Sequence, residues 1–139
     1  MPIKYDVYNN GKLIYAVASG SVTDEEYIEF EIKHAIDDRI KPPVSELLKI
    51  NSGAFKNITT YAISEVLNRR KKSKRNHIPH SCAIVVSYSD SHAWDLAKYY
   101  EGMVKLHYPA SVIVFGDEKI ALTWLGIDPG RFETLIITK

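Results

Sequence analysis

Two neighbouring hydroxyl groups are the first side chains of this 139-residue sequence that could take part in chemistry. Thr59 and Thr60 stand where a helix is expected to begin. A phosphate on either hydroxyl would meet the positive end of the helix dipole. The same oxygen atoms are also well suited to capping the helix. The sequence therefore leaves two roles open for them, phosphoacceptor and helix cap.

A run of basic residues follows at the end of the same expected helix, where cations complement the dipole. It holds six of the 18 lysines and arginines and no acid, although the whole chain has a formal net charge of only +1. The run is either a solvated helix end or a site for a phospholigand, an acidic partner or a membrane surface. We do not expect nucleic acid, because a short run without an aromatic platform makes few contacts. The anion-binding candidates are Arg69, Arg70, Lys71, Lys72, Lys74 and Arg75.

The histidines and the only cysteine form no recognisable metal or nucleophile motif. A zinc site needs three or four converging ligands, whereas the five histidines are scattered along the chain. Cys82 falls in an expected buried strand, where thiols are usually inert. Phosphate-binding loops and nucleophile elbows are also absent from the sequence. We therefore expect no catalytic residue, no metal and no cofactor, and a protein that is not an enzyme.

The elements that position these residues follow from the spacing of apolar side chains. Alternating residues on both sides of Asn9-Asn10-Gly11 predict an antiparallel hairpin. Thr23 and Glu26 have the spacing of a capping box, which predicts a helix start. The expected buried stripe of that helix is Ile28, Ile32, Ala35 and Ile36.

The second half of the chain predicts alternating strands and helices. The apolar runs 81–86 and 111–115 have no solvent face, so helices must cover both faces of their sheet. A further strand is expected at 47–50, helices at 91–107 and 118–125, and a C-terminal edge strand within 132–138. The prediction is one α/β domain over residues 1–139, with a mixed sheet of four to five strands and about four helices.

Three aromatic side chains do not fit these buried stripes and are candidates for a subunit contact or a ligand groove, and two apolar residues of the expected edge strand are candidates for a subunit contact. Aromatic side chains with a polar tip favour interfaces, and a free strand edge can pair with another subunit. We therefore expect a homo-oligomer, with a dimer as its simplest form. The interface candidates are Trp94, Tyr99, Tyr108, Leu135 and Ile137.

Composition and processing signals point to a cytoplasmic protein. Hydrophobic residues make up 45% and charged residues 25% of the chain, as in ordinary globular domains. A single cysteine allows no intrachain disulfide. The opening residues lack the apolar core of a signal peptide, and no apolar run is long enough to be an integral membrane segment.

Two stretches of the chain resemble the SpoIIAA-like proteins of the STAS superfamily. Residues 112–125, VIVFGDEKIALTWL, resemble the closing strand, Phe, acidic turn and Ala-x-x-Trp-Leu helix of that family. Residues 20–27, GSVTDEEY, resemble its glycine, threonine and acidic helix start. The order of elements also agrees from about residue 3 to residue 126.

This resemblance implies a non-enzymatic regulatory or protein-interaction module. In STAS anti-sigma-factor antagonists, a hydroxyl in an Asp-Ser-x-Gly context at the start of the second helix is phosphorylated. Thr59 and Thr60 occupy that region here, but the aspartate and the glycine are missing. The fold group is also compared with lipid-carrying CRAL-TRIO domains. A carrier or sensor of a small apolar or anionic ligand is therefore the alternative function.

Structural features separate these functions. A carrier needs an enclosed cavity of roughly a few hundred Å³. An enzyme needs converging titratable groups with shifted pKa values. An interaction module needs a shallow apolar surface.

Overall fold

The structure is a computed structural model that describes residues 2–72 and 79–137. Its hairpin of β1 (Ile3–Tyr8) and β2 (Leu13–Ala18) leads into α1 (Asp24–Ala35). Three strand-helix units follow, and a last helix ends the described chain. They are β3 (Ser45–Ile50) with α2 (Thr60–Lys72), β4 (Ser81–Val86) with α3 (Ser91–His107), β5 (Ser111–Phe115) with α4 (Glu118–Trp124), and finally α5 (Pro129–Ile137).

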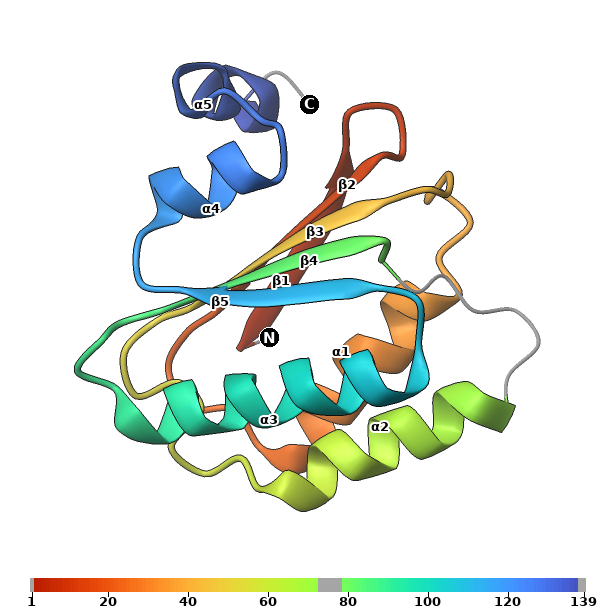
Figure 1. Cartoon of the computed structure of the whole chain (residues 1–139), viewed down its shortest axis with the longest axis vertical. Helices are drawn as coiled ribbons and strands as arrows, with labels where there is room; N and C mark the ends of the chain where they lie inside the picture. The colour runs from red at the N-terminus through yellow and green to blue at the C-terminus, as the bar shows by residue number, and fades with distance from the viewer. Residues whose placement is uncertain (1, 73–78, 138–139) are drawn as a thin grey trace.

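The strands form one mixed sheet in the order β1-β2-β3-β4-β5, seen in Figure 1. β1 is antiparallel to β2, and every later pair is parallel. This architecture confirms the predicted α/β class and the predicted N-terminal hairpin. Among the described residues, no helix is long and apolar enough to cross a membrane.

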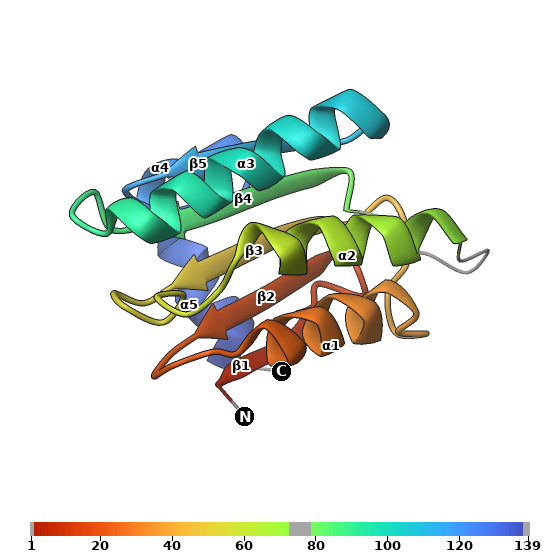
Figure 2. The same cartoon turned by 90° about the horizontal axis from the view of Figure 1, so that it is seen from below.

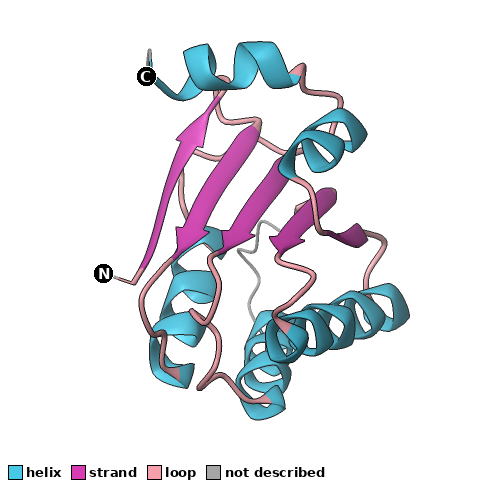
Figure 3. Ribbon diagram, turned by 90° about the vertical axis from the view of Figure 1, so that its left-hand side faces the viewer, coloured by secondary structure: helices cyan, strands magenta, loops and turns pink. Residues whose placement is uncertain are grey.

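Helices cover both faces of the sheet, as the two-sided apolar strands require. α1, α2 and α3 lie side by side on one face (Figure 2), and α4 and α5 lie on the other (Figure 3). β4 shows how one strand serves both cores. Cys82 and Ile84 pack into the larger core under α1–α3, whereas Ala83 and Val85 pack into the smaller core under α4 and α5.

Two local predictions from the sequence are confirmed. The hairpin turn holds Asn9, Asn10 and Gly11 at positive φ (54°, 56° and 86°), a conformation that these residue types tolerate. Thr23 caps α1 in a complete capping box. Its hydroxyl accepts the Glu26 amide at 3.2 Å, and the Glu26 carboxylate accepts the Thr23 amide at 2.9 Å.

The predicted C-terminal edge strand is wrong, because the segment forms the helix α5. Pro129 is its first residue, a position that needs no amide hydrogen. Phe132, Leu135 and Ile136 share one helical face and pack into the smaller core. Phe132 is 4% exposed and meets the Tyr15 ring edge-on at 5.0 Å. Burial of this stripe outweighs the β propensity of the residues, so the described chain has five helices and its sheet ends at β1 and β5.

Candidate functional site

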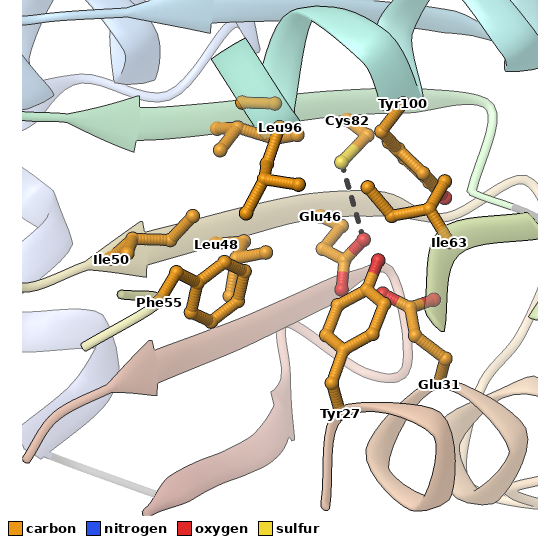
Figure 4. A pocket seen from close by; sticks show the side chains of 12 residues that line it. Tyr27, Glu31, Glu46, Leu48, Ile50, Phe55, Ile63, Cys82, Leu96 and Tyr100 are labelled. Carbon is orange, nitrogen blue, oxygen red and sulfur yellow. Dashed lines mark hydrogen bonds between the residues drawn. The ribbon is translucent and has the colours of Figure 1, made fainter. Parts of the chain in front are cut away.

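Four ionisable side chains come together in the interior, between the sheet and the helices α1 and α2. Glu31 and His34 lie on one face of α1, Glu46 comes from β3, and Arg70 comes from the last turns of α2. None of these residues is more than 2% exposed. We call these four residues the buried ion cluster. Figure 4 shows its two carboxylates beside Cys82 and two tyrosines.

The cluster is held by short polar contacts that join four elements. Arg70 Nη2 donates to Glu31 Oε2 at 2.6 Å, and His34 Nε2 lies 3.2 Å from the same oxygen. His34 Nε2 also lies 3.6 Å from Glu46 Oε2. The Cys82 thiol of β4 donates to Glu46 Oε1 at 3.2 Å. The cluster therefore ties the ends of α1 and α2 to the first residues of β3 and β4.

The contacts of His34 indicate where its proton lies. Nε2 faces the carboxylate of Glu31, so it is the nitrogen that donates. Nδ1 is buried and has no hydrogen-bond partner among the described residues. The carboxylate contacts thus place a proton on Nε2.

The two carboxyl groups of the cluster have opposite pKa shifts. Burial alone would raise the pKa of Glu31, but the charge of Arg70 and the contacts with His34 hold it below its usual value. Burial raises the pKa of Glu46, and His34 only partly offsets that effect. Glu31 and Arg70 thus form the ion pair, whereas burial shifts Glu46 towards its neutral form.

The nearby thiol and phenols are also held in their neutral forms. Burial, together with the neighbouring Glu46, raises the pKa of Cys82 well above its ordinary value. Burial likewise raises the pKa of Tyr27 and Tyr100 well above the usual tyrosine value. A protonated thiol is a poor nucleophile. The chemistry available here is hydrogen bonding and charge pairing.

The space beside the cluster is too small for a substrate. The cavity lined by Glu46, Cys82, Tyr27 and Tyr100 has a volume of about 10 Å³, which is room for about one water molecule. The larger hollows in the described surface are open grooves. One of about 600 Å³ runs along α3 beside Tyr99, Met103 and Leu106.

The two candidate phosphoacceptors are exposed at the start of α2. Thr59 donates its backbone N–H to Asp24 Oδ1 at 2.9 Å and its hydroxyl to Asp24 Oδ2 at 2.7 Å. These bonds tie the start of α2 to the first turn of α1. Thr60 is the first residue of α2. A phosphate on Thr59 would therefore remove the hydroxyl hydrogen bond that the Asp24 carboxylate now accepts.

The basic run does not form one surface. Arg69 is exposed and pairs with Glu65 at 2.8 Å, whereas the next residue, Arg70, belongs to the buried ion cluster. Helical spacing explains the difference, because Arg70 follows Val66 and Leu67 on the buried face. Lys71 and Lys72 are exposed. The remaining candidates, Lys74 and Arg75, lie outside the described residues.

Three interface candidates mainly join α3 and the segment after it to neighbouring elements. Half-buried Trp94 packs against Tyr88 with ring centroids 5.4 Å apart. The Tyr99 hydroxyl lies 3.1 Å from Ser64 Oγ of α2. The Tyr108 hydroxyl donates to the Leu67 carbonyl at 3.3 Å.

The two candidates on α5 have different surroundings. Leu135 is half-buried against the smaller core, whereas Ile137 is 77% exposed. Of the five interface candidates, Ile137 therefore has the most exposed side chain.

Sequence reasoning missed most of the buried ion cluster. Arg70 could have been found, since it continues the apolar stripe of α2. Glu31 and His34 contact each other one turn apart on α1, but the other members of the cluster, Glu46 and Arg70, lie far from them in the chain and give no local signal.

Metal ligands and known relatives add no further assignment. Within residues 2–72 and 79–137, no three or more histidine, cysteine or carboxylate side chains are grouped to hold a metal ion. No protein-family model, curated protein or solved structure matches the chain.

Proposed function

We propose that this chain is a non-enzymatic, SpoIIAA-like regulatory module that acts through protein–protein contacts in the cytoplasm, and that one partner is a second copy of itself. The observation that carries the proposal is a contrast between interior and surface. The converging ionisable groups are sealed in the core, while large apolar side chains are exposed. Leu106 is 76% exposed, Ile120 57% and Ile137 77%.

The buried ion cluster satisfies only half of what an active site requires. Its groups converge and have shifted pKa values, which favours a functional site. A substrate must also reach them, and the neighbouring cavity of about 10 Å³ admits no more than a water molecule. The arrangement supports a structural role for the cluster, in which one ion pair fixes how α1, α2 and β3 pack.

The carrier function has less support than the interaction module. A bound small molecule is usually enclosed in a pocket of about 300–1,000 Å³. The described surface has hollows of that size, but they are open grooves, such as the one of about 500 Å³ beside Ile28 and Ile32 of α1 and its C-cap residue Ile36. An open apolar groove suits a protein surface better than a sequestered ligand.

Native mass spectrometry of freshly purified protein tests this proposal. We expect the mass of a folded dimer with no additional component. Extra mass that disappears when the same sample is denatured would identify a ligand and overturn the proposal in favour of the carrier. A bare monomer at every concentration would overturn the second copy as a partner.

A further inference from the structure

We infer that the second copy binds at the outer edge of β5, where two β5 strands pair antiparallel about a two-fold axis at Ile113. This inference rests on the proposed function and names the site of that contact. The pairing would join two five-stranded sheets into one continuous sheet. It does not use the interface candidates that the sequence suggested.

The outer edge of β5 is open for pairing. β5 is the last strand of the sheet, and its only described strand partner is β4. In Figure 1 it is seen along its whole length, with no other described element drawn across it. The Ser111 amide bonds inward to the His80 carbonyl. Since strand residues alternate, the amide and carbonyl groups of Val112 and Val114 point outward.

The two edges of the sheet differ in how they are protected. β1 carries Lys4 and Asp6, and Arg39 of the loop before β3 donates to Asp6 at 2.6 Å. Charges of this kind discourage edge-to-edge pairing. β5 reads Ser-Val-Ile-Val-Phe and has neither a charge nor a proline. Of the two edges, β5 is therefore the one suited to accept another strand.

The alternation of outward groups fixes the register. Residues whose amide and carbonyl groups point outward must lie opposite residues of the same kind on the second copy. Pairing Val112 with Val114 of the second copy uses both such residues on each strand. Ile113 then lies on the two-fold axis opposite its own copy, in a pair without hydrogen bonds. It is 38% exposed although both neighbouring strand positions are more buried. Association would remove this apolar side chain from water.

Charges at the two ends of β5 favour the same antiparallel arrangement. Lys105 and His107 are exposed shortly before the strand, and Asp117 is exposed two residues after it, followed by exposed Lys119. Antiparallel pairing brings the start of one strand beside the end of the other. The basic end of each copy would therefore approach the Asp117 carboxylate of its partner, which favours this orientation over a parallel one. Because β5 has only five residues, we expect a small, reversible interface.

Light scattering on wild type, Ile113→Lys and Ile137→Lys over a range of concentrations tests the site. The substitution at Ile113 places two like charges opposite each other at the axis, which disfavours strand pairing. Ile137→Lys makes the same chemical change on α5, away from β5. We expect wild type and Ile137→Lys to dimerise and Ile113→Lys to remain monomeric, with unchanged circular dichroism.

A cysteine at the axis gives a second readout if the lysine variant folds poorly. A directly opposed pair without hydrogen bonds has Cα atoms about 4.5 Å apart, within the range of a disulfide. Ile113→Cys should therefore form a covalent dimer under mild oxidation, and Ile137→Cys should not.

The outcomes separate this inference from the proposed function. A wild-type dimer that survives Ile113→Lys, without cross-linking of Ile113→Cys, would overturn the β5 interface and leave the interaction module standing. Dissociation by Ile137→Lys alone would move the interface to α5. A wild-type monomer at all concentrations would overturn both.

Discussion

Replacing Arg70 with alanine should destabilise the protein far more than the same change at Arg69. Arg70 and Glu31 are each 2% exposed, and their contact is 2.6 Å long. Removal of Arg70 leaves the Glu31 carboxylate buried without its cation, beside only His34 and Tyr27. Breaking such a pair costs about 3–5 kcal/mol. Arg69 is 54% exposed and pairs with Glu65 one turn away. Losing an exposed pair of this kind costs less than about 1 kcal/mol.

Urea unfolding followed by circular dichroism measures both changes in one experiment. Arg69→Ala is the matched control, because it removes the same side chain from the next position of the same helix. Glu31→Gln combined with Arg70→Ala should recover part of the loss, since it removes the unpaired charge. Equal costs for the two alanine variants would refute the reasoning that the cluster is a sealed ion pair.

Three further experiments test separate parts of the structure. Burial raises the pKa of Glu46, so its contribution to stability is present at low pH and is lost as pH rises through the folded-state pKa. Glu46→Gln should therefore gain stability relative to wild type as pH rises above about 4.3. Paired thermal melts measure this difference, and the opposite trend would contradict a raised pKa at this buried acid. Gly102 lies within α3 with open space around it, so Gly102→Ala should raise the free energy of unfolding by up to about 1 kcal/mol. A lower free energy of unfolding would show that the added methyl group meets a close contact. Thr59→Val removes the hydroxyl bonded to Asp24 and should lower the free energy of unfolding by about 1 kcal/mol. Thr60→Val is the control and should lower it less. Equal urea midpoints for the two variants would show that the Asp24 contact contributes nothing.

Local signals made much of the fold predictable from sequence. The hairpin follows from Asn9-Asn10-Gly11, whose residues accept positive φ, and the start of α1 follows from the Thr23 and Glu26 pair. The two-sided apolar runs required helices on both faces of the sheet. In each case the deciding interaction lies within a few residues of the sequence that encodes it.

Features that depend on distant partners were not predictable in the same way. The predicted stripe of α1 placed Ile36 inside, but Ile36 is 49% exposed, and Glu31 and His34 are buried instead. Their burial is tolerable only because Arg70 arrives from another helix, 39 positions beyond Glu31. The same limit applies to α5, where packing of Phe132 against Tyr15 decides between helix and strand.

Labelling of the single cysteine tests most directly whether the buried ion cluster is sealed. Cys82 lies in contact with Glu46 and is 3% exposed, so it reports on access to the cluster in the unmodified protein. We expect a thiol reagent such as 5,5′-dithiobis(2-nitrobenzoate) to leave the native chain unlabelled and to modify one thiol per chain in denaturant. Rapid labelling of the folded protein would show that solutes reach these groups, and would contradict a structural cluster and a non-enzymatic module.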